Sequence, residues 1–62
     1  MTLSPRQTDV AMLIAEGLPN KEIACRLGIG ERSVKTHAAL AMAKYGVKTR
    51  TALAVKIVRQ QV

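Results

Sequence analysis

Apolar side chains recur along the chain at the three- and four-residue spacing of a helix face, in four segments joined by short polar connections. No stretch alternates as a strand does. The connections are about three to five residues long, as is usual in a compact helical domain. The pattern therefore predicts an all-α fold, one compact four-helix domain over residues 1–62, with helices that run from Ser4 to Gly17, from Asn20 to Gly28, from about Glu31 to Gly46, and from Thr49 onward.

Start and stop signals agree with these boundaries. Ser4 is followed by Pro5 and Gln7, which is a capping box with proline at the first helical position. Asn20 and Thr49 are the residue types that cap helix N-termini, so we expect both to be N-caps. Each of the first three segments closes on a glycine, the residue preferred just after a helix.

The apolar faces of the four helices define the expected core. Its members are mostly small or aliphatic, and Tyr45 is the only aromatic residue. A core this thin makes a 62-residue domain marginal by itself, so a second copy or a neighbouring domain would help it. The expected core residues are Val10, Leu13, Ile14 and Leu18; Ile23, Ala24 and Leu27; Val34, Ala38, Ala41, Met42 and Tyr45; and Leu53, Ala54 and Ile57.

Residues 20–46 carry the spacing of a helix-turn-helix. Ala24 is small where two helices must cross, Gly28 supplies the tight turn, Ile29 fills the corner, and Val34 opens the buried face of the next helix. In a helix-turn-helix the second helix lies in the major groove of DNA. Other helical hairpins share parts of this spacing, so the spacing alone leaves both possibilities open.

Charge is distributed unevenly along the chain. Residues 1–31 hold three basic and four acidic side chains, for a net charge of −1, whereas residues 32–62 hold seven basic side chains and no acidic one, for +7. A basic surface of this kind attracts a polyanion such as nucleic acid. The alternative is an ordinary solvated charged surface.

Several short motifs in one order make the chain resemble the LuxR-type (NarL/FixJ, GerE-like) helix-turn-helix DNA-binding domain. They are LSPR at the start, AEGLPNKEIA, RLGI, SVKTH, and GVKTRTALAV, and they cover residues 3–55. The resemblance implies a four-helix domain that binds double-stranded DNA as a homodimer and regulates transcription, with RNA polymerase as a further candidate partner. It also implies that the third helix reads DNA and that the fourth forms the dimer contact.

On a helical wheel, the N-terminal half of the third helix turns four side chains away from the core face: Arg32, Lys35, Thr36 and Ala39. These are the predicted base contacts. Lys35 can reach a guanine edge or a phosphate, and Thr36 can place its methyl group against a thymine methyl. Ala39 offers only a methyl contact. The alternative is that they are merely solvated.

The predicted phosphate contacts are Ser33, Lys21, Arg50, Lys48 and His37. Phosphate contacts position a protein on DNA without specifying sequence. Capping and ordinary solvation are the alternatives for Ser33, Lys21 and Arg50. His37 is the only histidine and lies beside the core face, so we expect it to be packed or to face phosphate.

The fourth helix carries a second apolar stripe, opposite its core face. It consists of Thr51, Val55, Val58 and Val62. An exposed valine stripe on so small a domain favours a two-fold dimer surface. A weak contact, or docking onto a preceding domain, is the alternative.

Other functional classes find little support. No Cys or carboxylate stands near His37 at ligand spacing, so we expect no metal site, no cofactor, no small-molecule ligand and no enzymatic activity. The single Cys25 rules out an internal disulfide and favours a reduced, cytoplasmic setting. There is no signal peptide and no apolar run near 18 residues, so we expect no membrane segment.

Two other identities stay open on the sequence. Region four of a sigma factor also joins LSPRQ to a helix-turn-helix, although the fourth helix favours the LuxR type. A helical module that binds protein rather than DNA would explain the alanines of the third helix. The chain is either an excised C-terminal domain or a free-standing small regulator.

Overall fold

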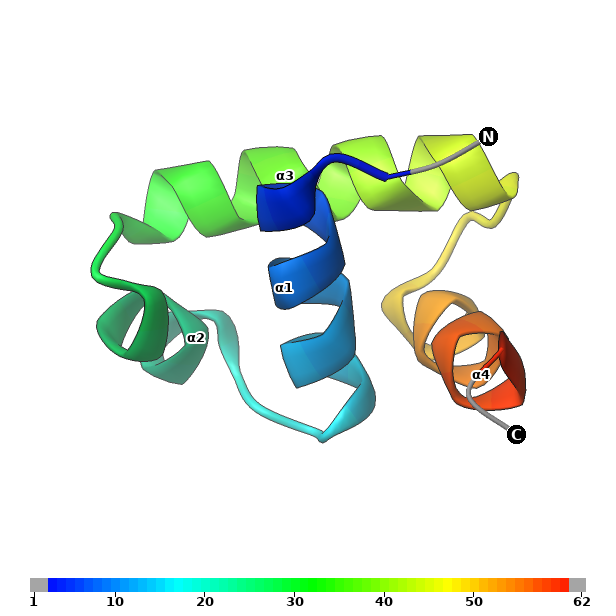
Figure 1. Ribbon diagram of the computed structural model, residues 1–62, viewed down its shortest axis with the longest axis horizontal. Coiled ribbons are helices and arrows are strands. Elements are labelled where there is room, and N and C mark those ends of the chain that lie inside the picture. The colour runs from blue at the N-terminus through cyan, green and yellow to red at the C-terminus, as the bar shows by residue number, and fades with distance from the viewer. Residues whose placement is uncertain (1–2, 61–62) are drawn as a thin grey trace.

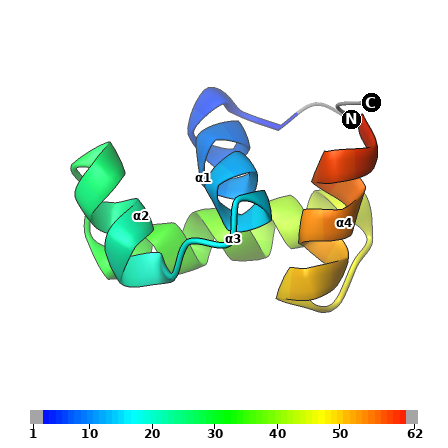
Figure 2. The ribbon, with the colours of Figure 1, turned by 90° about the horizontal axis from the view of Figure 1, so that it is seen from below.

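The computed structural model describes residues 3–60, which fold into four helices and contain no strand. They are α1 (Pro5–Ala15), α2 (Asn20–Leu27), α3 (Glu31–Tyr45) and α4 (Arg50–Gln60). The long helix α3 runs along one side of the molecule, and α2, α1 and α4 lie in that order on its other side (Figures 1 and 2). The predicted all-α architecture, with a helix-turn-helix formed by the second and third helices, is confirmed.

Two of the three predicted N-caps are confirmed. The Ser4 hydroxyl accepts a hydrogen bond from the Gln7 amide, and the Ser4 amide donates to Gln7 Oε1, both at 3.2 Å. Thr49 Oγ1 accepts from the Ala52 amide at 3.0 Å at the start of α4. Each bond satisfies an amide that would otherwise lack a partner at a helix start.

The prediction that Asn20 caps α2 is wrong by one position. Pro19 is the N-cap, in extended backbone (φ −73°, ψ 160°), and Asn20 is the first helical residue. The Pro19 carbonyl accepts from the Glu22 and Ile23 amides at 3.0 Å. The side-chain oxygen of Asn20 accepts instead from Arg50, a residue that lies 30 positions away and that no local pattern connects to it.

The glycines that end α2 and α3 are required by backbone geometry. Gly28 and Gly46 both take φ 67°, where any other residue would cost about 1–2 kcal/mol. The next residue in each case, Ile29 or Val47, donates its amide back into the last helical turn and packs against the core. Ile29 thus fills the corner as predicted.

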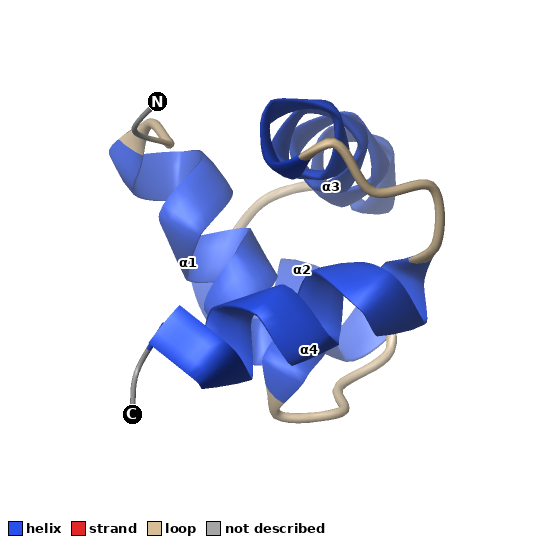
Figure 3. Ribbon diagram, turned by 90° about the vertical axis from the view of Figure 1, so that its right-hand side faces the viewer, coloured by secondary structure: helices blue, strands red, loops and turns tan. Residues whose placement is uncertain are grey.

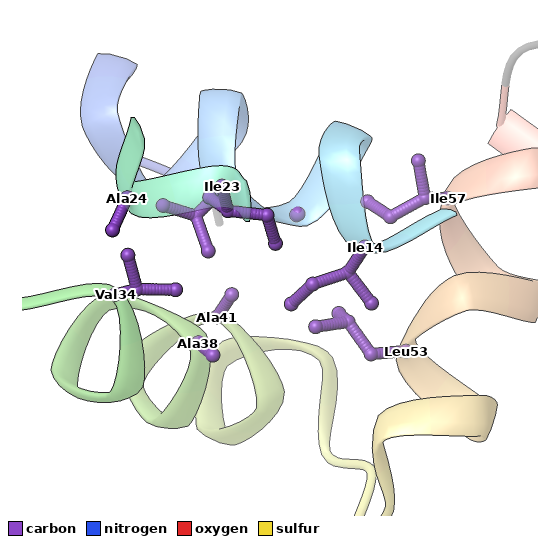
Figure 4. Packing of buried hydrophobic residues seen from close by; sticks show 10 residues of the cluster. Ile14, Ile23, Ala24, Val34, Ala38, Ala41, Leu53 and Ile57 are labelled. Carbon is purple, nitrogen blue, oxygen red and sulfur yellow. The ribbon is translucent and has the colours of Figure 1, made fainter. Parts of the chain in front are cut away.

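The core is one cluster that all four helices share (Figure 4). Ile23, Leu53, Val10 and Val34 are fully buried. Alanines at the crossings of α3 let the other helices approach it closely. The other buried members are Ala11, Ile14, Ala24, Ala38, Ala41 and Ile57, and the remaining predicted core residues, Leu13, Leu18, Leu27, Met42, Tyr45 and Ala54, are half-buried against the cluster.

A hydrogen bond also joins the C-terminal ends of α3 and α4. The Tyr45 hydroxyl donates to Gln60 Oε1 at 2.5 Å. Viewed from the side of α4, that helix lies in front, with the C-terminal end of α3 above it (Figure 3). The core and this bond therefore fix the C-terminal end of α4 against α3.

Candidate nucleic-acid interface

The N-terminal half of α3 presents a polar face to solvent. Arg32, Lys35, Thr36 and Ala39 are all exposed, while Val34 between them is fully buried. The other three helices pack on the opposite side of α3, so this face is left uncovered (Figure 1). The structure confirms the predicted outward orientation of these four residues; their contact with DNA stays a prediction.

The two charges on this face are available to a partner. Within residues 3–60, neither Arg32 nor Lys35 is paired with a carboxylate. An Arg or Lys head held in solvent without an internal partner can bind a base edge or a phosphate oxygen. The face therefore has the charge and the donors that a polyanion requires.

Thr36 is partly engaged within the helix. Its hydroxyl donates to the Arg32 carbonyl oxygen at 3.1 Å. With the hydroxyl proton used in this way, the methyl group and the accepting lone pairs of the oxygen are what Thr36 can offer to a base.

Ser33 lies in the first turn of α3, where the helix start has no side-chain cap. Amides at such an end attract anions, and Ser33 is exposed there. The carboxylate of Glu31 stands in the same turn. A phosphate at Ser33 would therefore have to approach against one negative charge.

Lys21 and Lys48 are exposed lysines outside α3. Lys21 lies in the first turn of α2, and Lys48 lies in the connection between α3 and α4. Lys21 thus lies on the helix that leads into the exposed face, whereas the connection that holds Lys48 is at the other, C-terminal end of α3 (Figure 1). Their phosphate contacts stay predictions.

Arg50, the third basic residue predicted to contact phosphate, is used inside the domain. It is half-buried, and its two terminal nitrogens donate to Asn20 Oδ1 at 2.6 Å and to the Leu18 carbonyl oxygen at 2.7 Å. Its predicted phosphate contact stays untested. No local sequence pattern indicates this bridge, because the acceptors lie 30 and 32 positions away.

His37 lies at the border between the core and the exposed face. The residue is half-buried, and its Nδ1 is buried without a hydrogen-bond partner among the described residues. This agrees with the expectation of a largely packed ring. In residues 3–60, no group of three or more His, Cys, Asp or Glu side chains gathers where a metal ion could bind.

The outward face of α4 is apolar. Val55 is 45% exposed and Val58 is 49% exposed, with Thr51 exposed one turn earlier. Leu53 and Ile57 on the opposite side are buried, so the predicted division of α4 into two stripes is confirmed. Val62, predicted to belong to the outer stripe, lies outside the described residues.

Three other positions matched expectation or remain without a role. Cys25 and Met12 are exposed. Leu40 is 44% exposed on α3, and nothing in the structure explains it. None of the helices in residues 3–60 has the length and apolar character needed to cross a membrane.

Known families and structures agree with this architecture. The family described as bacterial regulatory proteins, luxR family, matches residues 1–57. Among solved structures, the response regulator ChrA of a heme-sensing two-component system superposes with a TM-score of 0.84 at 39% identity, over 98% of this chain and 30% of that one.

Curated relatives include two bacterial regulators. The nitrate/nitrite response regulator NarL of Escherichia coli K12 is 43% identical over 60 residues, which cover 97% of this chain. The uncharacterized transcriptional regulatory protein YhcZ of Bacillus subtilis is 46% identical over 57 residues, or 92% of this chain. The chain spans only 28% and 27% of the length of these relatives. The match favours the LuxR type over the sigma-factor alternative.

Proposed function

The chain belongs to the luxR family of bacterial regulatory proteins, and on that premise we propose that it binds double-stranded DNA as a homodimer, with α3 in the major groove. We place it in the cytoplasm, as the DNA-binding effector domain of a longer response regulator. Its NarL and ChrA relatives are response regulators, and the chain matches under a third of each.

The observation that carries this proposal is the uncovered basic face at the start of α3. Arg32 and Lys35 project from a helix whose other side is buried in the core, and neither charge is neutralised within the described chain. Lys35 is our principal base contact because lysine donates to guanine O6 and N7. Thr36 and Ala39 add methyl contacts, and Arg32 completes the face.

Phosphate contacts would hold this helix in register. We assign them to Lys21 on α2, to Ser33 and His37 on α3, and to Lys48 in the connection to α4. Backbone contacts of this kind fix orientation and supply most of the salt-dependent affinity.

The dimer contact is assigned to the valine stripe of α4, Thr51, Val55 and Val58, with Val62 beyond the described residues. Exposed apolar area on a domain of this size is costly unless a partner covers it. A second copy would cover the same stripe on both subunits about a two-fold axis. RNA polymerase is a further candidate partner of the bound dimer.

A fluorescence-anisotropy titration across salt concentrations tests the proposal. DNA sequences would first be selected by the protein from a random pool, and an unselected duplex would serve as the control. We expect tighter binding to selected DNA, with log K falling by about 0.9 per phosphate neutralised as log salt rises. Weak binding that is equal for selected and unselected DNA and does not change with salt concentration would contradict the proposal.

One observation favours a second candidate, a protein-binding module. Ala39 and the exposed Leu40 adjoin on α3, and neither offers a hydrogen bond to a base edge. A flat response in the same titration, with the fold intact by circular dichroism, would favour this alternative over DNA binding.

A further inference from the structure

The helices α2 and α4 lie on opposite sides of α1 (Figures 1 and 2). Within residues 3–60 they do not pack against each other, although each packs against both α1 and α3. The first turn of α2 contains the predicted phosphate contact Lys21, and α4 carries the predicted dimer stripe. Their relative orientation is therefore set indirectly, through their shared neighbours, unless a side chain spans the gap.

Arg50 spans it. It is the first residue of α4, and it donates at 2.6 Å to Asn20, the first residue of α2, and at 2.7 Å to the carbonyl of Leu18 just before it. The guanidinium lines an open depression of about 370 Å³ between the two helix starts, together with Pro19 and Thr51. The bridge thus connects positions directly beside Lys21 and Thr51.

The chemistry of this bridge suits a rigid connection. A guanidinium is planar and always charged, so its two bonds fix a direction as well as a distance. Both acceptors are neutral oxygens, so the positive charge of Arg50 is not cancelled. The C-terminal end of α4 is held separately by the bond from Tyr45 to Gln60. Arg50 therefore adds a direct side-chain link between the N-terminal end of α4 and the start of α2, beside the core contacts of Leu53.

We propose that Arg50 is a positioning residue rather than a phosphate contact: it sets the orientation of α4, and with it the dimer partner, relative to the helix-turn-helix. In a dimer this angle decides how far apart the two α3 helices lie. Arg50 would thereby determine which spacing of DNA half-sites the dimer accepts. This inference rests on the proposed function, since it concerns the geometry of dimeric DNA binding.

Binding to single and paired half-sites separates positioning from phosphate contact. The variants are Arg50→Gln, which replaces the charged guanidinium with a shorter neutral amide that cannot reach both acceptors in the same way, and Asn20→Ala, which removes one acceptor and leaves every charge in place. Lys48→Gln is the matched control, because it removes one exposed positive charge two residues from Arg50. Paired sites would carry spacers that differ by single base pairs.

For Arg50→Gln we expect a loss of about fivefold or more at the preferred spacing, with a flattened preference among spacers and little change on a single half-site. Asn20→Ala should change binding in the same way but by less, because the bond from Arg50 to the Leu18 carbonyl remains. The double variant should lose no more than Arg50→Gln alone, because both substitutions act on one bridge. Lys48→Gln should keep the spacing preference. The inference is overturned if Asn20→Ala binds paired sites as wild type does, while Arg50→Gln reduces the slope of log K against log salt concentration by about 0.9 on a single half-site.

A distance measurement tests the same inference without DNA. Cys25 is the only cysteine and is exposed on α2, and Lys56 is exposed on α4, so Lys56→Cys provides a second site for a nitroxide label. We expect a narrow distance distribution that broadens in Arg50→Gln and in Asn20→Ala. Asn20→Asp, which keeps an acceptor oxygen, should stay narrow.

Unchanged distributions in both bridge-breaking variants would overturn the inference, whatever the protein binds. Wild-type protein that binds DNA without regard to sequence or salt would instead contradict the proposed function. In that case a broadened distribution would still show that Arg50 positions α4. The two failures are thus distinguishable.

Discussion

The outward faces of α3 and α4 differ in character although both helices bury their inner faces in the same core. At the start of α3 the outer face carries Arg32 and Lys35 without internal partners. On α4 it carries Val55 and Val58, each nearly half exposed. Charged side chains are well hydrated in solvent, whereas exposing the apolar surface of valines to water costs free energy.

This difference indicates two kinds of partner on two helices of one small domain. A charged face gains from a polyanion through released counterions and direct donors. A valine face gains free energy only when its apolar surface is removed from water. Packing against the same face of a second copy removes it. Since one core supports both, a change in the core should abolish both, and a change on either face should affect that face alone.

The largest expected effect is the loss of the shared core. Leu53 is fully buried on α4, and Leu53→Ala should destabilise the fold by about 2–5 kcal/mol through lost burial and the cavity left behind. A 62-residue domain has little stability in reserve, so both faces should be lost together. Urea unfolding followed by far-UV circular dichroism measures this change.

Val55→Ala is the matched control, because it truncates an aliphatic residue on the same helix where the side chain is 45% exposed. We expect it to change the free energy of unfolding by less than about 0.5 kcal/mol. Equal losses for the two variants would mean that α4 does not have separate buried and outer stripes.

The elements of this fold were predictable because their signals are local. The capping box at Ser4, the glycines after α2 and α3, and the periodic apolar residues each act within one or two turns, so neighbouring residues reveal them. The exposure of Arg32, Lys35, Val55 and Val58 followed from the same periodicity. Such signals specify where each helix lies and which side it buries.

What sequence reasoning missed depends on contacts between distant residues. Asn20 is a good N-cap by type, but its oxygen is used by Arg50, and Pro19 takes the cap position. Arg50 looks like a free cation in the sequence because no acidic residue lies near it in the chain. Only the packing of four helices brings the start of α4 to the turn before α2, and that packing has no local pattern.

The second prediction affects the charged face alone. Lys35→Ala should weaken binding to selected DNA by about 1–3 kcal/mol, the range for one good base contact, while the fold and self-association stay as in wild type. Anisotropy titrations on selected and unselected duplexes measure it. Lys56→Ala, an exposed lysine on α4, serves as the control for lost charge. Equal losses on both duplexes would make Lys35 a phosphate contact instead.

The smallest expected effect is confined to the apolar face. Val58→Asp places a charge on each copy where the two stripes would meet, and it should weaken self-association at least about tenfold, or 1.4 kcal/mol, without unfolding the monomer. Sedimentation velocity over a concentration series measures the change. Met12→Asp is the matched control, because Met12 is 41% exposed on α1, away from the stripe, and should leave association unaltered. If both variants associate as wild type does, the valine stripe is not the dimer surface, and the contrast between α3 and α4 has another cause.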